Sequence, residues 1–555
     1  MNIDRNIALS RWPAVAGIAF LLFLLGTVGV EITRIDIRFA LMVQDMTLHG
    51  IGVFPTVNGA PYGDYPSGWV AAAYLATLGG RWVSLPLLAL PAILAGTFLV
   101  TMTYLAGERV EKNTGLLAAV FLLVTPEFLS LVTGFGIDAP VAAAGAAMLY
   151  LFQAKTPDRI TGGVWFLLLV FCFLVRGPLG IVLLGAGTGG YLLALRRGRS
   201  VLLFGFLGLA AAVFCGAAWY WAVHRQGGEP LWREFWRCQV GTRLDGGGYF
   251  EYFTGGLLSF APVSLLAFAV FFLPRRELLS GPVAGWLGFL LLPLVILSIP
   301  GCKHLRYLGM TLPAFALTAA YAWNGRRPWR FLRERFPGFV RALFRAVPWL
   351  ALSGIPVLAV VGCVLTDAGF LPWRHFLLAA LLIAAVLFVS RGASPVWRTA
   401  LPPMIFLAAA LLPFEAALEN SAAFVSEIEN LPGKTVYLYN LGPDHDDLKY
   451  VFSTRPEKRS RIRYLFDADR RFPPAIERMY PHMTAAEGMK AVTKEDLVIL
   501  RDRREERESL LGWAERYGYR IEPAGFGTMG HRGFLAVRLA EKDGSGDFAT
   551  SENGK

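Results

Sequence analysis

Acidic and basic side chains recur in five of the polar segments that separate long hydrophobic stretches of this chain. Charges at the ends of membrane spans are costly unless they are paired, solvated or used, so each is a candidate functional residue. Any single one is explained as well by anchoring at the membrane surface. The set as a whole is not explained in this way: Asp36, Arg38, Asp45, Asp64, Asp138, Arg176, Arg233, Glu234, Arg237, Arg243, Asp245, Lys303, His304 and Arg306.

This mixture of charges suits a substrate that carries a phosphate. Arg and Lys side chains hold phosphate oxygens and stabilise the charge that develops on a leaving phosphate. A carboxylate can take the proton of an incoming hydroxyl. A sugar carried on a lipid phosphate fits a membrane setting, because its tail lies in the bilayer while its head group lies at the surface. The residues therefore suggest transfer of a lipid-linked sugar.

The elements that must position these residues are membrane helices. The chain has 555 residues, of which 55% are apolar and only 17% charged, which indicates a polytopic membrane protein. No small-residue cleavage site follows the first apolar stretch, so we expect an uncleaved anchor. The pair around Arg176-Gly177-Pro178 is either a hairpin or one broken helix. We predict about thirteen spans, at 13–31, 83–106, 115–132, 138–154, 161–176, 178–195, 200–223, 254–273, 281–299, 305–323, 347–366, 375–390 and 399–418.

The distribution of positive charge predicts the orientation. The formal net charge is +12, and arginines concentrate at 196–199, 275–276 and 324–346. The positive-inside rule places these segments, and the N-terminus, in the cytoplasm. An odd number of spans then places the loop 31–82 and the C-terminal segment on the periplasmic side of a bacterial inner membrane. Binding of nucleic acid is not expected, since juxtamembrane anchoring explains the basic segments.

A soluble segment follows the last span. Residues 419–542 alternate strand-like runs (435–439, 463–466, 497–500 and 534–539) with helical runs (485–492 and 505–517), which predicts a small α/β domain. We expect residues 543–555 to be a disordered tail. The chain shows no internal repeat, phosphate-binding loop or dinucleotide fingerprint, and its five cysteines have no metal-ligand spacing.

Several motifs resemble the family 39-type glycosyltransferases of the GT-C fold, which include the lipid A aminoarabinose transferases and, more distantly, the protein O-mannosyltransferases. The resemblance covers roughly the first 325 residues. It implies a membrane enzyme that moves a monosaccharide from a polyprenyl phosphate to a lipid, glycan or protein acceptor in the cell envelope. The motifs that carry it are Asp36-Ile37-Arg38-Phe39-Ala40, Asn58-Gly59-Ala60-Pro61-Tyr62-Gly63-Asp64-Tyr65-Pro66, Gly136-Ile137-Asp138-Ala139-Pro140, Leu174-Val175-Arg176-Gly177-Pro178 and Lys303-His304-Leu305-Arg306-Tyr307.

The resemblance implies catalytic roles for Asp36 and Asp138. The family has an adjacent Asp-Glu pair in the first loop, whereas here Ile35 precedes Asp36 and one acid remains, with Glu31 as the fallback. The alternative for each Asp is a structural role as the N-cap of a helix.

Other residues receive binding roles. We expect Arg243, Lys303, Arg306, Tyr307 and Arg176 to hold the donor phosphate, and Arg38, Tyr62 and Asp64 to bind the acceptor or the sugar. A helical turn would present Lys303 and Arg306 on one face. Arg176, at a helix break, could instead orient a loop.

The metal question and a rival function stay open. Asp64 matches an acid that lies near a metal in the aminoarabinose transferase, but the expected His is replaced by Gln239, so we predict that no cofactor is required and leave a divalent metal as the alternative. The rival function is a transporter or flippase for a lipid-linked or anionic substrate. Transporters place ionisable groups near mid-membrane and show repeat-related broken helices, and neither pattern is evident in this sequence.

Overall fold

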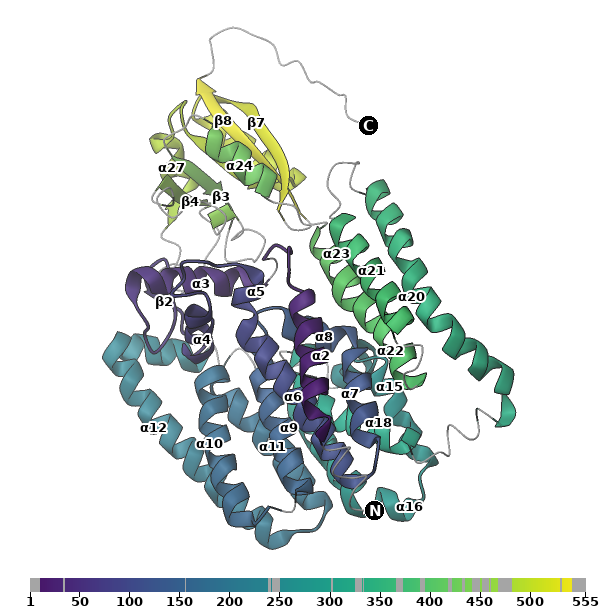
Figure 1. The fold of residues 1–555 in the computed structure, drawn as a ribbon. Coiled ribbons are helices and arrows are strands. Elements are labelled where there is room, and N and C mark those ends of the chain that lie inside the picture. The colour runs from purple at the N-terminus through teal and green to yellow at the C-terminus, as the bar shows by residue number, and fades with distance from the viewer. Residues whose placement is uncertain are drawn as a thin grey trace. The chain divides into compact units, whose positions relative to one another are not determined.

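The chain divides into two compact units. The first comprises Met1–Val30, Met42–Thr56 and Pro61–Ala417, and the second comprises Glu31–Leu41, Val57–Ala60 and Leu418–Lys555. The computed structural model (Figure 1) describes residues 10–32, 35–154, 156–237, 241, 250–300, 303–324, 332, 334–365, 373–389, 395–417, 422–431, 435–441, 450–451, 459, 461–467, 482–529 and 532–541.

The first unit is built from apolar helices, as predicted. Six described helices are long and apolar enough to cross a membrane, or eight if each of two bent pairs counts as one span. Every predicted span coincides with one helix or with two or three consecutive ones. In chain order these are α2 (Trp12–Leu25), α6 (Leu90–Val110), α7 (Thr114–Leu123), α8 (Pro126–Thr133), α9 (Ala139–Gln153), α10 (Asp158–Arg176), α11 (Pro178–Ala194), α12 (Gly198–Trp236), α14 (Glu251–Ser259), α15 (Val263–Ala267) with η2 (Phe268–Phe272), α17 (Gly281–Ser298), η3 (Leu305–Thr311) with α18 (Leu312–Asn324), α20 (Pro337–Leu365), α21 (Trp373–Val389), and α22 (Pro395–Phe406) with η5 (Leu407–Leu411) and α23 (Leu412–Ala417).

Proline and glycine account for most departures from the predicted spans. The predicted span 115–132 is bent by 73° between α7 and α8, where Pro126 starts the second helix, and 254–273 is bent by 107° around Pro262. Proline has no N–H and disfavours helical geometry in the residue before it. Helix α12 continues to Trp236, past the predicted end at 223, with a break at Gly228. Short helices α4 (Gly68–Ala76), α5 (Leu85–Leu88) and α16 (Arg275–Leu278) complete the unit.

The pair around Gly177 is a hairpin of two helices. Arg176 ends α10, and Gly177 takes φ 72° and ψ −155°, a conformation that non-glycine residues avoid. Pro178 then begins α11, the position where proline is best tolerated in a helix. Helices α10 and α11 contact each other along their lengths (Figure 1).

The second unit contains the predicted α/β fold. Its sheet has the order β5-β4-β3-β6-β8-β7, with β5, β4, β3 and β6 parallel and β8 antiparallel to both of its neighbours. The four predicted strands are present, whereas β5 and β7 were not predicted. Gly518, with φ 75°, follows the end of α28. The elements are α24 (Ala422–Asn430), β3 (Val436–Tyr439), β4 (Ile462–Phe466), β5 (His482–Thr484), α27 (Ala485–Ala491), β6 (Leu497–Arg501), α28 (Arg504–Arg516), β7 (Tyr519–Met529) and β8 (Arg532–Glu541).

A carboxylate joins two strands of this sheet to α28. Asp467, directly after β4, accepts hydrogen bonds from Tyr439, Asn440, Ser509 and Trp513 at 2.8 to 3.0 Å. Burial raises the pKa of Asp467, but the four hydrogen bonds lower it further, so this pKa lies below its ordinary value.

The first polar loop is shared between the two units. It begins with α3 (Ile35–His49) and continues through a two-stranded hairpin, β1 (Thr56–Val57) and β2 (Ala60–Pro61). The start of α3 and the tip of the hairpin belong to the second unit, where Asn58 hydrogen-bonds the Tyr464 side chain of β4. The rest of the loop belongs to the first unit.

Candidate functional site

The centre of the candidate site is a buried ion pair between Asp138 and Arg176. The Nε atom of Arg176 donates to Oδ1 of Asp138 at 2.6 Å, and the two side chains are 0% and 3% exposed, respectively. Asp138 stands at the N-cap position of α9, but its side chain makes no capping hydrogen bond. The carboxylate is therefore engaged with arginine rather than with the helix end, so the alternative of a capping role does not describe its contacts.

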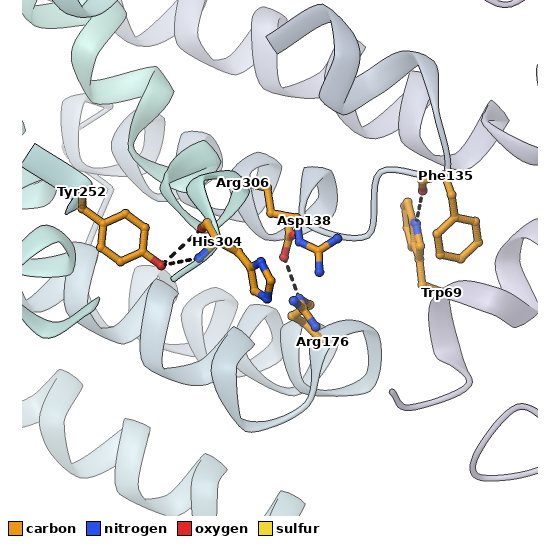
Figure 2. A network of polar contacts seen from close by, with 7 residues as sticks. All are labelled: Trp69, Phe135, Asp138, Arg176, Tyr252, His304 and Arg306. Atoms are coloured by element: carbon orange, nitrogen blue, oxygen red, sulfur yellow. Dashed lines mark hydrogen bonds and ion pairs between the residues drawn. The ribbon is translucent and has the colours of Figure 1, made fainter. Parts of the chain in front are cut away.

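A second arginine approaches the same carboxylate from another helix. The Nε atom of Arg306, in η3, lies 3.5 Å from Oδ2 of Asp138, and the Arg306 side chain is 26% exposed. Figure 2 shows Asp138 between the two arginine side chains. Two guanidinium groups thus face one carboxylate.

Aromatic rings enclose Arg176. Its guanidinium lies 5.1 Å from the ring centre of Tyr65 and 5.2 Å from that of Tyr307, within the range of cation–π attraction. Burial raises the pKa of Tyr65, and the Asp64 carboxylate beside it acts in the same direction, so the hydroxyl stays protonated. The ring of Tyr62 stacks on that of Tyr65 at 5.9 Å.

Several polar atoms of the cluster are buried and lack a hydrogen-bond partner within the described part of the chain. These atoms are Nη1 and Nη2 of Arg176, Nε of Arg306 and Oδ2 of Asp138. Buried donors are almost always satisfied in native proteins, and leaving a charged one unsatisfied is costly. Three of the four atoms are cationic donors, so a bound anion would satisfy them.

Backbone geometry fixes the positions of these side chains. Gly136, with φ 52°, lets the chain turn before Asp138; a Cβ there would lie 2.2 Å from the carbonyl oxygen of Leu131. The indole of Trp69 donates to the carbonyl of Phe135 at 2.8 Å and ties the first loop to this turn (Figure 2). The first loop, α9 and α10 are thus held together around the ion pair.

A tyrosine from α14 supports the segment that carries Arg306. The hydroxyl of Tyr252 accepts from the backbone N–H of His304 at 2.9 Å and donates to its carbonyl at 3.3 Å (Figure 2). Tyr252 is 1% exposed. This contact holds the backbone two residues before Arg306.

Lys303 faces away from this cluster. Its ammonium donates to the carbonyls of Leu297 at 3.0 Å, Ser298 at 2.7 Å and Pro300, at the end of α17. These contacts use the three N–H donors of the ammonium, and its positive charge lies at the C-terminal end of α17, where the helix dipole favours a cation. The prediction that one helical turn presents Lys303 and Arg306 on the same face is wrong, because η3 begins only at Leu305.

The other predicted site residues lie elsewhere or outside the described residues. Asp36, in the first turn of α3, and Arg38 belong to the second unit, and both are half-buried. Arg243 and Gln239 fall outside the described residues. No three His, Cys, Asp or Glu side chains group to hold a metal within the described ranges, and the metal alternative at Asp64 stays a hypothesis.

The sequence did not single out Tyr65 or Tyr252 as binding residues. In the sequence, Tyr65 stands out only as part of the motif Asn58–Pro66. Its position between Asp64 and Pro66, in the motif already matched to the family, is the signal that could have identified it. For Tyr252 the sequence offers no such signal, because its partner is a backbone segment 52 residues away.

No family model matches this chain, and no curated protein matches its sequence. Crystal structures of ArnT from Cupriavidus metallidurans, bound to undecaprenyl phosphate and in the apo state, align with TM-scores of 0.70 and 0.69 at 16% identity, each covering 94% of this chain and 97% of that chain. The oligosaccharyltransferase of Archaeoglobus fulgidus aligns with a TM-score of only 0.43 at 14% identity, over 82% of this chain and 64% of that chain. The likeness to ArnT confirms the predicted GT-C fold.

Proposed function

We propose that this chain is a membrane glycosyltransferase that takes a monosaccharide from a polyprenyl phosphate. Two facts support the proposal. The fold is shared, over nearly the whole chain, with an ArnT structure that holds undecaprenyl phosphate. The first unit also holds a cluster of two arginines around one carboxylate, with buried cationic donors to spare. The second fact carries the argument, because such donors match the oxygens of a phosphate.

Within this proposal Arg306 makes the first contact with the phosphate. It is the more exposed arginine of the pair and approaches Asp138 only loosely, at 3.5 Å. Arg176 lies deeper and supplies fixed positive charge from the Nη atoms. As the sugar is transferred, negative charge grows on the leaving phosphate, and a preorganised cation stabilises the transition state more than the ground state.

Asp138 then acts as a positioning residue. Both of its oxygens face guanidinium groups, and its side chain is only 3% exposed. Asp36 keeps the catalytic role that the family resemblance gives it. The acceptor oxygen attacks the anomeric carbon, its proton passes to Asp36, and the bond to the phosphate breaks with its electron pair. Direct displacement inverts the anomeric centre.

The acceptor is a lipid, glycan or protein of the cell envelope. We place the reaction at the periplasmic side of a bacterial inner membrane, on the basis of the positive-inside distribution of arginines. Asp64 and Tyr62, beside Tyr65, are the proposed sugar or acceptor contacts in the first unit, and Arg38 is the proposed contact in the second unit.

The first test compares binding of undecaprenyl phosphate with binding of undecaprenol by the purified full-length protein. We expect selective binding of the phosphate, weakened about 10- to 100-fold in Arg306→Gln, as for loss of a charged hydrogen bond. Arg233→Gln is the matched control, since Arg233 is 78% exposed and pairs with Glu229 at 2.9 Å. Equal binding of the two lipids would contradict the assignment of the site.

The second test measures transfer from radiolabelled polyprenyl-phosphate sugars, comparing wild type with Asp36→Asn. Transfer that is lost in the variant while donor binding is retained supports the proposed reaction. Donor movement across liposomes without any transfer would replace the enzyme by the rival transporter. Transfer that survives in Asp36→Asn would remove the role of Asp36 and leave Glu31 as the next candidate.

A further inference from the structure

A cavity lies in the first unit, between α10, α11 and α12. Its volume is about 290 Å³, and the three helices contact one another around it (Figure 1). Trp165 lines it from α10, eleven residues before Arg176, which is about 16 Å along a helix that rises about 1.5 Å per residue. Asp138, Arg176 and Arg306 are not among the residues that line the cavity, so it is distinct from the candidate active site.

Two residues that line this apolar cavity each carry a buried polar atom without a partner in the described part of the chain. These atoms are the indole Nε1 of Trp165 and the hydroxyl of Thr188, whose residues are 4% and 0% exposed. An indole N–H can only donate a hydrogen bond. A ligand that suits this cavity is therefore mainly apolar but carries an acceptor oxygen, such as the ester carbonyl of a lipid.

Glycines keep the cavity open. A Cβ atom placed on Gly185 or Gly205, which line it, would meet no atom within 4 Å. By contrast, Gly190 lies against the backbone of Gly288, where a Cβ would come within 2.1 Å of the carbonyl oxygen. Helix packing therefore requires glycine at 190 but not at 185 or 205, where the missing side chains leave room for a ligand.

Positive charge surrounds one end of the cavity. Arg197 donates its N–H to the carbonyl of Leu192 at 3.1 Å and accepts from the N–H of Val201 at 2.9 Å; Leu192 and Val201 both line the cavity. Ser200 donates to Asp158 at 2.8 Å, which brings the start of α10 to the same end. Four arginines at this end are exposed and make no ion pair or hydrogen bond through their side chains with the described residues: Arg159, Arg196, Arg197 and Arg199.

We propose that the cavity between α10, α11 and α12, together with the arginines at its end, is a groove that binds an anionic glycerophospholipid. Its phosphate lies on the arginines, one acyl chain lies in the groove, and an ester carbonyl accepts from Trp165. Basic pockets between membrane helices recognise anionic lipid head groups in this way. The charge favours an anionic lipid over a zwitterionic one, and the unpartnered indole favours an ester lipid over a polyprenyl phosphate, which has no carbonyl.

The test uses quenching of Trp165 fluorescence in the full-length protein by lipids with brominated acyl chains. The Trp165→Phe variant is subtracted so that only quenching of Trp165 counts. We expect phosphatidylglycerol to quench at lower concentration than phosphatidylcholine, and undecaprenyl phosphate not to compete. Equal quenching by the two phospholipids, or displacement by undecaprenyl phosphate, would overturn the proposal without touching the proposed enzyme activity.

Matched variants separate the groove from the membrane surface in general. Gly205→Leu fills the groove and should abolish the preference, whereas Gly216→Leu, on the same helix and also with open space at its Cβ, should keep it. Arg197→Gln with Arg199→Gln should weaken phosphatidylglycerol binding about 25-fold, from about fivefold per arginine. The same double change at Arg275 and Arg276, exposed in α16, should not. If the preference for phosphatidylglycerol persists in Gly205→Leu, the groove is not the binding site.

Discussion

Replacing Asp138 by Asn should destabilise the first unit severely. Arg176 is fully buried and bonded to Asp138 at 2.6 Å, so the change leaves a guanidinium in the interior without its carboxylate. Removing one partner of a buried pair costs about 3–5 kcal/mol. At about 2 °C per kcal/mol, the value for larger domains, the apparent melting temperature should fall by about 6–10 °C.

The geometry predicts an order among related variants. Arg176→Met should cost less than Asp138→Asn, because Asp138 keeps Arg306 at 3.5 Å as a partner. Arg306→Gln should cost less than either change, because Arg306 is 26% exposed and lies 3.5 Å from Asp138, whose other oxygen keeps Arg176. The double variant, with both charges of the pair removed, should recover most of the loss, since replacing a buried pair by neutral groups is often close to neutral.

The assay is thermal unfolding of the detergent-solubilised full-length protein. Unfolding is monitored as the loss of the monodisperse peak in size-exclusion chromatography. Undecaprenyl phosphate binding is measured on the same samples. The double variant should be stable yet bind the lipid weakly, which separates folding from function. A double variant whose loss equals the sum of the two single losses would refute the reasoning, because each side chain would then act through its own packing.

Three further changes probe other parts of the structure. Gly177→Ala should lower stability and lipid binding together, because φ 72° costs a residue other than glycine about 1–3 kcal/mol; Gly185→Ala, with open space at its Cβ, is the control, and an unchanged Gly177→Ala protein would contradict this. Tyr252→Phe removes both hydrogen bonds to His304 and should weaken undecaprenyl phosphate binding about fivefold, or about 1 kcal/mol, so wild-type binding would remove the supporting role. Because the pKa of Asp467 is lowered in the folded state, its carboxylate stabilises the sheet above the ordinary pKa, and this stabilisation is lost as pH falls through the folded-state value. Hydrogen exchange of the sheet should therefore rise on acidification in wild type and change less in Asp467→Asn, and equal pH profiles would argue against the network.

The sequence predicted the helical content better than the helix ends. Thirteen apolar stretches coincide with helices because burial in lipid requires each backbone group to be satisfied within its own segment. The bends at Pro126 and near Pro262 were missed, because hydropathy carries no information on the direction of the helix axis. The end of α12 was also missed, because a helix that leaves the apolar layer continues for as long as its polar residues allow.

Candidate site residues could be predicted one by one, but not their pairing. Asp138 and Arg176 were both singled out, yet for different roles, because nothing in a single sequence shows that residues 38 positions apart share an ion pair. Lys303 and Arg306 seemed equivalent from their spacing. Their partners differ because the chain is extended at His304, before η3 begins, and so turns the lysine back towards α17.

The division of the first loop between the two units limits how this protein can be rebuilt or can have evolved. The chain passes between the units after residues 30, 41, 56, 60 and 417. Removing the C-terminal segment would remove Tyr464, the hydrogen-bond partner of Asn58. It would also remove most of the unit to which the start of α3 belongs. The C-terminal segment therefore cannot be exchanged independently of the first loop. A homologous domain grafted in its place would have to bring a matching first loop with it, so the two segments are expected to be inherited together.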